Sequence, residues 1–153
     1  MHPLLKRTLI FIALMIAGLV LYVKWFDTRA DRYDEVAVPY LHDAVPVLAG
    51  WQVEPLLPLL SPDARRDFEN DQLRNAYLGF SRLGSMLSMQ KPQFLSSNSA
   101  TSNSLGDVEI VEYEVVSEFD SGPARIKLKL LLHDQDYYIH HFGVYSEVFA
   151  TSN

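Results

Sequence analysis

An apolar run from Leu9 to Val23, interrupted only by one glycine and one tyrosine, most restricts what this chain can fold into. Its fifteen residues would span about 23 Å as a helix, which is short for a hydrocarbon core of about 30 Å. Adding Trp25 and Phe26, with Lys24 extending its amine to the interface, lengthens the segment to about 27 Å. We therefore predict a single transmembrane helix.

A cleaved signal peptide and a buried core helix are the alternatives to this membrane helix. Cleavage requires small residues, but the residues after the run are bulky, and only Thr28-Arg29-Ala30 offers a weak site ending at Ala30. A buried core helix is disfavoured because the run has no polar face. We expect residues 1–30 to be an uncleaved signal-anchor with its N-terminus inside, because a short basic tail before an apolar run is typical of that class. Residues 31–153 would then form an extracytoplasmic domain of a bacterial inner-membrane protein, in the periplasm or outside the cell.

Composition excludes several functional classes for the rest of this 153-residue chain. Residues 27–153 contain nineteen acidic and ten basic residues, a formal charge of −9. Phosphate neutralisation needs clustered Lys and Arg, so we expect no nucleic-acid partner. Without cysteine the chain has no disulfide, thiol nucleophile, cysteine zinc site or lipidated cysteine. About 120 residues suffice for one compact domain.

Helical periodicity dominates the first part of this domain. Apolar positions from Tyr33 to Leu48 recur at the i, i+3, i+4 spacing of an amphipathic helix, and we expect a kink or fresh start near Pro39 and an end near Gly50. Ser61-Pro62-Asp63 predicts a capped short helix over residues 64–68. A further helix is expected to begin at Asn70-Asp71-Gln72, with its apolar stripe reaching Leu83 or Leu87.

After Lys91-Pro92 the period changes to two, which predicts strands. The polar tract over residues 96–104 is expected to be a hairpin connection or an edge. A long strand over residues 108–119 shows a slip at Ile110 and Val111 that suggests a bulge. Turns at residues 120–123 and 134–136 bound a strand that is dry on the face of Ile126, Leu128, Leu130 and Leu132, and a last strand is expected over residues 137–148. Helices followed by an antiparallel sheet of about four strands define an α+β fold, with the helices on one face of a curved sheet.

The C-terminal hairpins resemble those of the cystatin-like, nuclear transport factor 2-like superfamily. The resemblance lies in Tyr113 to Phe149, YEVVSEFDSGPARIKLKLLLHDQDYYIHHFGVYSEVF, and in Leu78 to Gly84, which is similar to the helix end before the sheet in membrane-anchored bacterial members of unknown function. The resemblance implies a cone between helices and sheet, where enzymatic members hold a proton-exchanging Asp and His. The chain departs from this family pattern in two places. It has Tyr137-Tyr138 where such strands usually have tryptophan, and the turn before this strand has no glycine.

Few residue sets suggest chemistry. His133, His140 and His141 lie on the last two strands, but adjacent strand residues point to opposite faces, so at most one of the latter pair can join His133. Two imidazoles are too few for catalytic zinc, and we interpret all three as edge or solvent-facing. We interpret the strand carboxylates as outward-facing; they are Glu109, Glu112, Glu114 and Glu118. We interpret the aromatic residues as core; they are Trp51, Tyr77, Phe80, Phe94, Tyr113, Phe119, Tyr138 and Phe142.

Two functional hypotheses follow, and we predict no catalytic, cofactor or metal residues for the one we favour. The first is a membrane-anchored, non-enzymatic interaction module, an accessory protein that docks a partner protein or membrane complex. The second is a small-ligand or enzymatic pocket in the concave face of the sheet. A deep cone with an ionisable pair at its base would favour the second hypothesis, and a cone filled by leucine and phenylalanine the first.

Overall fold

The computed structural model describes residues 3–150, with side chains from residue 7. Contacts divide the chain into two compact units, Met1–Glu35 and Val36–Asn153, and helix α1 (Pro3–Leu48) contributes to both. The predicted membrane segment lies in the first unit. The second unit contains every other helix and strand.

The first unit presents its apolar run entirely to the outside. From Leu9 to Val23 the large side chains are 48–69% exposed, and none of the apolar window is buried inside the protein. The helix is long and apolar enough to cross a membrane. Next to the run, the guanidinium of Arg29 lies 4.3 Å from the ring centroid of Trp25. This pairing suits the polar boundary of a bilayer, where aromatic and basic side chains gather.

In the second unit, the last turns of α1 bury one apolar stripe. The stripe repeats at helical spacing as predicted, although Val36 is exposed. Pro39 and Pro46 lie inside the helix, which continues through both without a fresh start and ends at Leu48. Both prolines are on the exposed side, where water can satisfy the carbonyl groups that lose an amide donor. The buried members of the stripe are Ala37, Leu41, Ala44, Val45 and Leu48.

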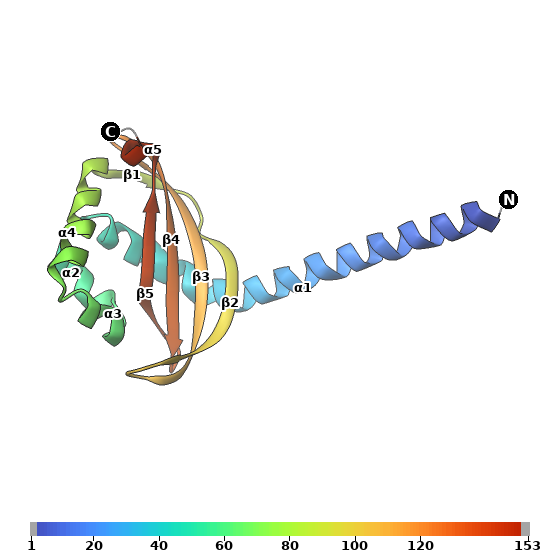
Figure 1. Ribbon diagram of the computed structural model, residues 1–153, viewed down its shortest axis with the longest axis horizontal. Helices are drawn as coiled ribbons and strands as arrows, with labels where there is room; N and C mark the ends of the chain where they lie inside the picture. Colours follow the sequence, from blue (N-terminus) through green and yellow to red (C-terminus); the bar gives the residue numbers. More distant parts are fainter. Residues whose placement is uncertain (1–2, 151–153) are drawn as a thin grey trace. The chain divides into compact units, whose positions relative to one another are not determined.

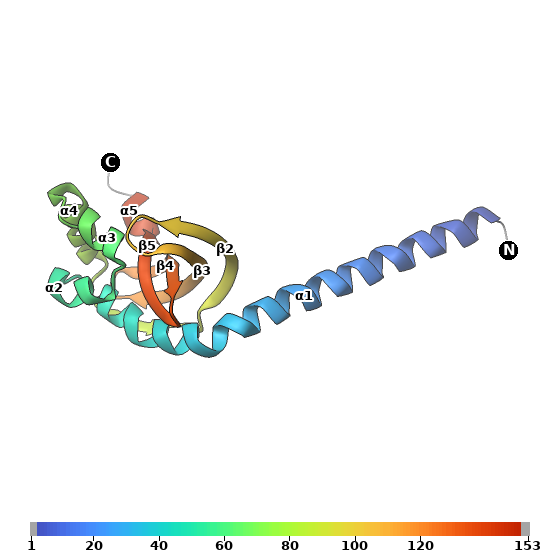
Figure 2. The ribbon, with the colours of Figure 1, turned by 90° about the horizontal axis from the view of Figure 1, so that it is seen from below.

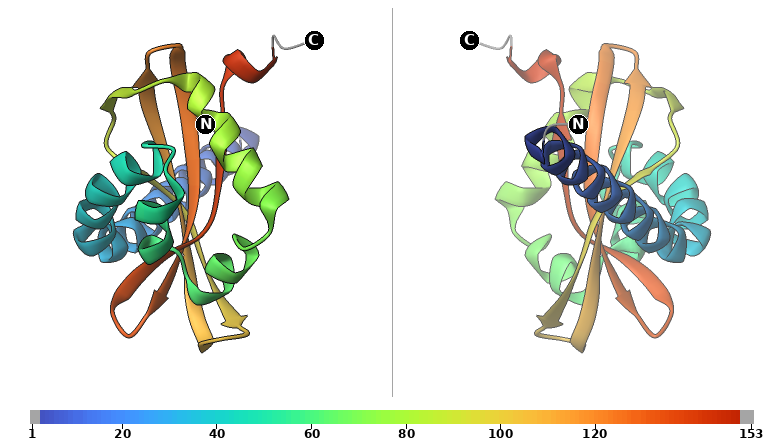
Figure 3. Two further views of the ribbon diagram at one scale, coloured as in Figure 1. Left: turned by 90° about the vertical axis from the view of Figure 1, so that its left-hand side faces the viewer. Right: turned by 90° about the vertical axis from the view of Figure 1, so that its right-hand side faces the viewer.

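Short helices and an antiparallel sheet complete the α+β fold that the sequence predicts, although the sheet has five strands where about four were expected (Figure 1). The helices α2, α3 and α4 lie on one face of the sheet (Figure 3, left), and the strands bend into an arc (Figure 2). The helical elements after α1 are α2 (Val53–Leu56), η1 (Leu57–Leu59), α3 (Pro62–Asp67), α4 (Asp71–Gly79), η2 (Phe80–Leu83) and α5 (Glu147–Ala150). The strands are β1 (Met86–Met89), β2 (Gln93–Ser102), β3 (Gly106–Phe119), β4 (Gly122–His133) and β5 (Asp136–Tyr145).

Side-chain caps start α3 and α4 where the sequence predicts them. The Ser61 hydroxyl accepts the amide of Ala64 at 3.2 Å, and the Asn70 side chain accepts the amide of Gln72 at 2.8 Å. Each cap satisfies one of the amides that a first helical turn leaves without a partner. The predicted extension of the second helix to Leu87 is wrong, because Leu87 lies in β1.

Strand β3 organises the sheet. One side of β3 pairs along its length with β4, and the other pairs first with β2 and then with β1. The polar tract therefore forms part of an edge strand, β2, and the turn to β3 occupies only residues 103–105. Strand β4 lies between β3 and β5 and is therefore an interior strand of the sheet.

The interior face of β4 is dry at Ile126, Leu128 and Leu130, each 0% exposed, whereas Leu132 is half-buried. The neighbouring Leu131 is also 0% exposed, so β4 is covered on both of its faces at Leu130 and Leu131. Packing on both sides explains why the alternation of apolar residues breaks down there.

Two strand predictions need correction. No bulge occurs at Ile110, because β3 pairs with β4 in continuous register; the irregularities lie in β1, beside Leu95 in β2 and beside His140 in β5. The last strand ends at Tyr145 and not at Val148, because the chain enters helix α5. The hydroxyl of Ser146 accepts the amide of Val148 at 3.4 Å, a local bond that competes with strand pairing.

Candidate functional site

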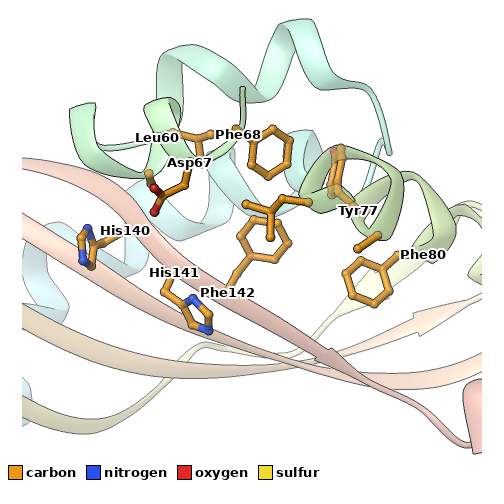
Figure 4. A pocket seen from close by; sticks show the side chains of 11 residues that line it. Leu60, Asp67, Phe68, Tyr77, Phe80, His140, His141 and Phe142 are labelled. Atoms are coloured by element: carbon orange, nitrogen blue, oxygen red, sulfur yellow. The ribbon is translucent and has the colours of Figure 1, made fainter. Parts of the chain in front are cut away.

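A surface cleft of about 180 Å³ lies between α3, α4 and β5 and is called here the α4–β5 cleft (Figure 4). Its walls are mainly apolar, and its few ionisable groups gather at one end, as the close-up shows. Eleven residues line it: Leu60, Ala64, Asp67, Phe68, Leu73, Ala76, Tyr77, Phe80, His140, His141 and Phe142.

Three aromatic rings form the apolar wall of the cleft. The ring of Phe142 lies 5.9 Å from Tyr77 and 6.5 Å from Phe68, and Phe68 lies 5.5 Å from Tyr77, between ring centroids. Two of the three pairs meet edge to face, the geometry that ring quadrupoles favour. The capped starts of α3 and α4 help to set the positions of two of these rings, because Phe68 follows the last residue of α3 and Tyr77 lies about two turns into α4.

The hydroxyl of Tyr77 points away from the cleft opening toward α1. It donates to the carbonyl of Leu48 at 2.8 Å, with the carbonyl of Gln52 3.3 Å away. Burial raises the pKa of the Tyr77 phenol to about 12, so the hydroxyl stays a donor over the physiological range. Tyr77, which is 1% exposed, therefore supports the cleft wall from behind, and its hydroxyl binds the end of α1.

The polar end of the cleft contains a carboxylate without a partner. The Asp67 side chain is exposed and makes no hydrogen bond or ion pair with any residue that the structure describes. Its basic neighbours are engaged elsewhere: Arg65 donates to the carbonyl of Leu57 at 3.1 Å, and Arg66 to the hydroxyl of Ser104 at 3.4 Å. Asp67 is thus available to bind a cationic group.

His140 and His141 both line this cleft, although they were predicted to point to opposite faces of the sheet. Strand β5 has an extra residue between the pairs Leu130–Ile139 and Lys129–His141, and this bulge interrupts the alternation of side chains. The Nδ1 atom of His140 lies 3.0 Å from the Ser61 hydroxyl. Because Ser61 is fully buried and also caps α3, this contact ties β5 to α3.

His133 lies outside the cleft, beside the turn that joins β4 and β5. Its Nε2 is 3.3 Å from the carboxylate of Asp134. Asp134 and Gln135 adopt positive φ angles of 50° and 72°, the conformation of a tight hairpin turn that usually contains glycine. Within residues 7–150, no three His, Asp or Glu side chains gather in a way that could hold a metal ion.

The strand carboxylates do not enter the cleft. Glu112 and Glu114 alternate with buried residues of β3 and lie across from Lys129 and Lys127 of β4. The Glu114 carboxylate is 3.9 Å from the Lys127 amine. Glu118 is exposed, whereas Glu109 is half-buried. Glu112 and Glu114 therefore form an acidic row beside the basic row of Lys129 and Lys127 on the outer face of the sheet. Glu109 pairs with Leu132 and shares the face of Val111, so the prediction that it points outward is wrong.

The predicted core aromatics divide between the interior and the cleft. Trp51, Phe94, Tyr113 and Phe119 are buried, whereas Tyr138 is half-buried. Tyr77 is also buried and backs the cleft, whereas Phe80 and Phe142 are half-buried and line it. Sequence reasoning missed Asp67 and Phe68, although the capped helix that ends beside them was predicted.

Hydrogen bonds join the first turn of α3 to the end of β2 and to the β2–β3 turn. Asp63 accepts from the hydroxyls of Ser102, at 2.7 Å, and Ser104. The bond from Ser104, followed by that from Ser102, lowers the pKa of the Asp63 carboxyl below its usual value. These bonds are present above the ordinary carboxyl pKa and are lost as the pH falls through the lowered value.

Comparisons with protein-family models, with curated proteins and with solved structures found no match to this chain. The chain contains an α+β domain that follows an apolar helix, and this domain has a mainly apolar cleft with the Asp67 carboxylate at one end.

Proposed function

We propose that this chain is a membrane-anchored, non-enzymatic docking module, an accessory protein that binds a partner protein or membrane complex. The apolar segment of α1 anchors it in a bacterial inner membrane as a single pass with the N-terminus inside. The domain then lies in the periplasm or outside the cell. A relationship to the cystatin-like superfamily is part of this proposal and is supported by the order of helices before a curved antiparallel sheet.

The observation that supports docking most strongly is the filled interior of the sheet. Tyr113, Leu128 and Leu130 are 0% exposed, and Phe119 is 2% exposed. Cavities that bind drug-sized ligands usually measure about 300–1,000 Å³ and are lined by apolar groups. The mainly apolar α4–β5 cleft, at about 180 Å³, is smaller and lies at the surface. Its size favours a single side chain of a partner over a whole organic ligand.

A small-ligand or enzymatic pocket remains the second candidate. The one feature that favours it is Asp67 beside two imidazoles, since an acid and a base in a cleft can exchange protons with a ligand. The cleft of Figure 4 would then be the binding site, at the edge of the concave face.

Docking is tested by cross-linking the full-length protein in intact spheroplasts and purifying it in mild detergent. A membrane-impermeant, amine-reactive reagent reaches the exposed lysines Lys91 and Lys129 only if the domain is outside the cytoplasm. We expect one protein to be recovered in constant ratio with the chain.

Two outcomes would contradict this expectation. Labelling only after the cells are broken would place the domain inside. A purified chain without any partner in constant ratio, with or without cross-linking, would remove docking as the function. The control is a double substitution, Lys91→Arg with Lys129→Arg, which keeps the charges and should reduce cross-linking without reducing the uncross-linked partner.

A further inference from the structure

We propose that the α4–β5 cleft receives an aromatic side chain of the partner and that Asp67 binds a lysine or arginine next to it. This inference rests on the proposed function for the source of the group, a partner polypeptide. It specifies the side chains that this polypeptide must contain, an aromatic residue with a lysine or arginine next to it. The argument uses the volume of the cleft, its aromatic wall and its unpaired charge.

The volume fits one aromatic ring. A dry cavity of about 150 Å³ lined by apolar side chains is known to bind benzene, and the cleft measures about 180 Å³. Phe142 and Phe80 are half-buried at its wall, and the ring of Phe142 packs edge to face on the buried ring of Tyr77, which gives the cleft an aromatic lining of the kind that aromatic side chains prefer. Leu73, 44% exposed, extends the apolar surface at the rim. Anchors of this kind dominate the energetics of protein interfaces.

Charge complementarity identifies the neighbouring residue of the partner. Asp67 lies at one end of the cleft, apart from Phe80 at the other (Figure 4). Since Arg65 and Arg66 are bound to other groups, neither arginine competes with a ligand for the carboxylate. The acidic surface of the domain, with a charge of −9 over residues 27–153, would also attract a basic segment. A ring with an adjacent cation therefore matches both ends of the cleft.

The test uses the full-length protein in nanodiscs of zwitterionic lipid and three probes, acetyl-Phe-Lys-amide, acetyl-Phe-Glu-amide and acetyl-Ala-Lys-amide. Titrations are followed through the backbone NMR signals of His141 and Phe142. We expect Phe-Lys to bind about two- to fivefold more tightly than Phe-Glu, as one exposed ion pair allows. Ala-Lys should bind at least about tenfold more weakly, because the buried ring is lost.

Matched variants locate the two parts of the site. Asp67→Asn should remove the preference for Phe-Lys over Phe-Glu, whereas Glu69→Gln, an exposed neighbour outside the cleft, should keep it. Ala76→Trp should block the cleft and abolish the shifts. Asn75→Trp places the same side chain on the exposed surface of α4 outside the cleft and should leave binding unchanged.

Equal affinities for Phe-Lys and Phe-Glu, or for Phe-Lys and Ala-Lys, would overturn the proposal. Phenethylamine that binds much more tightly than the dipeptide would show a small-molecule site and overturn the polypeptide source. A partner recovered from spheroplasts without probe discrimination would refute the cleft assignment and leave docking intact. Probe discrimination without any such partner would refute docking and leave the chemistry of the cleft intact.

Discussion

Leu130→Ala is expected to lower the free energy of unfolding of the domain by about 2–5 kcal/mol, the usual cost of truncating a buried leucine. Leu130 is 0% exposed in the central strand β4, and it pairs with Val111 of β3 and Ile139 of β5. The packed neighbours on both sides limit how far the site can collapse around the lost atoms. The free energy of unfolding of a small domain is about 5–15 kcal/mol, so this loss is a large fraction of the total.

Thermal unfolding of the full-length protein in detergent, followed by near-ultraviolet circular dichroism, measures this effect. Lys129→Ala is the control, because Lys129 is the exposed neighbour in the same strand. Its effect should lie within about 0.5 kcal/mol, as for most surface changes. Melting temperatures for Leu130→Ala and Lys129→Ala that differ by less than a degree or two would mean that β4 is not the centre of the core.

Gly84→Ala should be the second strongly destabilising change. Gly84 has φ 79° and ψ −155°, a backbone conformation that is essentially restricted to glycine, and forcing alanine into it costs about 1–3 kcal/mol. An added Cβ would also lie 2.7 Å from the side chain of Asp120. That carboxylate accepts the amide of Ser85 at 2.7 Å, and the Gly84 carbonyl accepts the indole of Trp51 at 2.9 Å. Any shift that relieves the clash disturbs these two bonds.

Gly79→Ala is the matched control for this substitution. Gly79 ends helix α4 with an ordinary helical backbone, and nothing lies within 4 Å of an added Cβ. Alanine there should be neutral or stabilise by up to about 1 kcal/mol. Chemical denaturation of both variants measures the difference, and equal midpoints would show that the connection between α4 and β1 does not need glycine.

Local signals in the sequence were sufficient for much of the fold. The caps at Ser61 and Asn70 depend on hydrogen bonds within two or three residues, so their side chains alone indicate where the helices begin. Alternation along Ile126, Leu128 and Leu130 likewise depends only on the pleat of one strand.

Features that depend on distant partners were placed wrongly or missed. The bulge beside His140 is a property of the pairing between β4 and β5, and the sequence of β5 alone does not reveal it. Asp67 and Phe142 are 75 positions apart in the sequence and meet in one cleft only after α3 packs against β5. A binding cleft built from separate elements therefore had no local signature.

The intact mass of the protein extracted from its native membrane tests the central claim of a membrane-anchored module most directly. Because the bulky residues Trp25 and Phe26 disfavour cleavage after the apolar run, we predict that the membrane fraction contains the chain with residues 1–30 still attached. After a carbonate wash, which removes peripheral proteins, the full mass should remain in the pellet. A mature form that begins near Asp31, recovered in the soluble fraction, would show that the segment is a cleaved signal and would contradict the account.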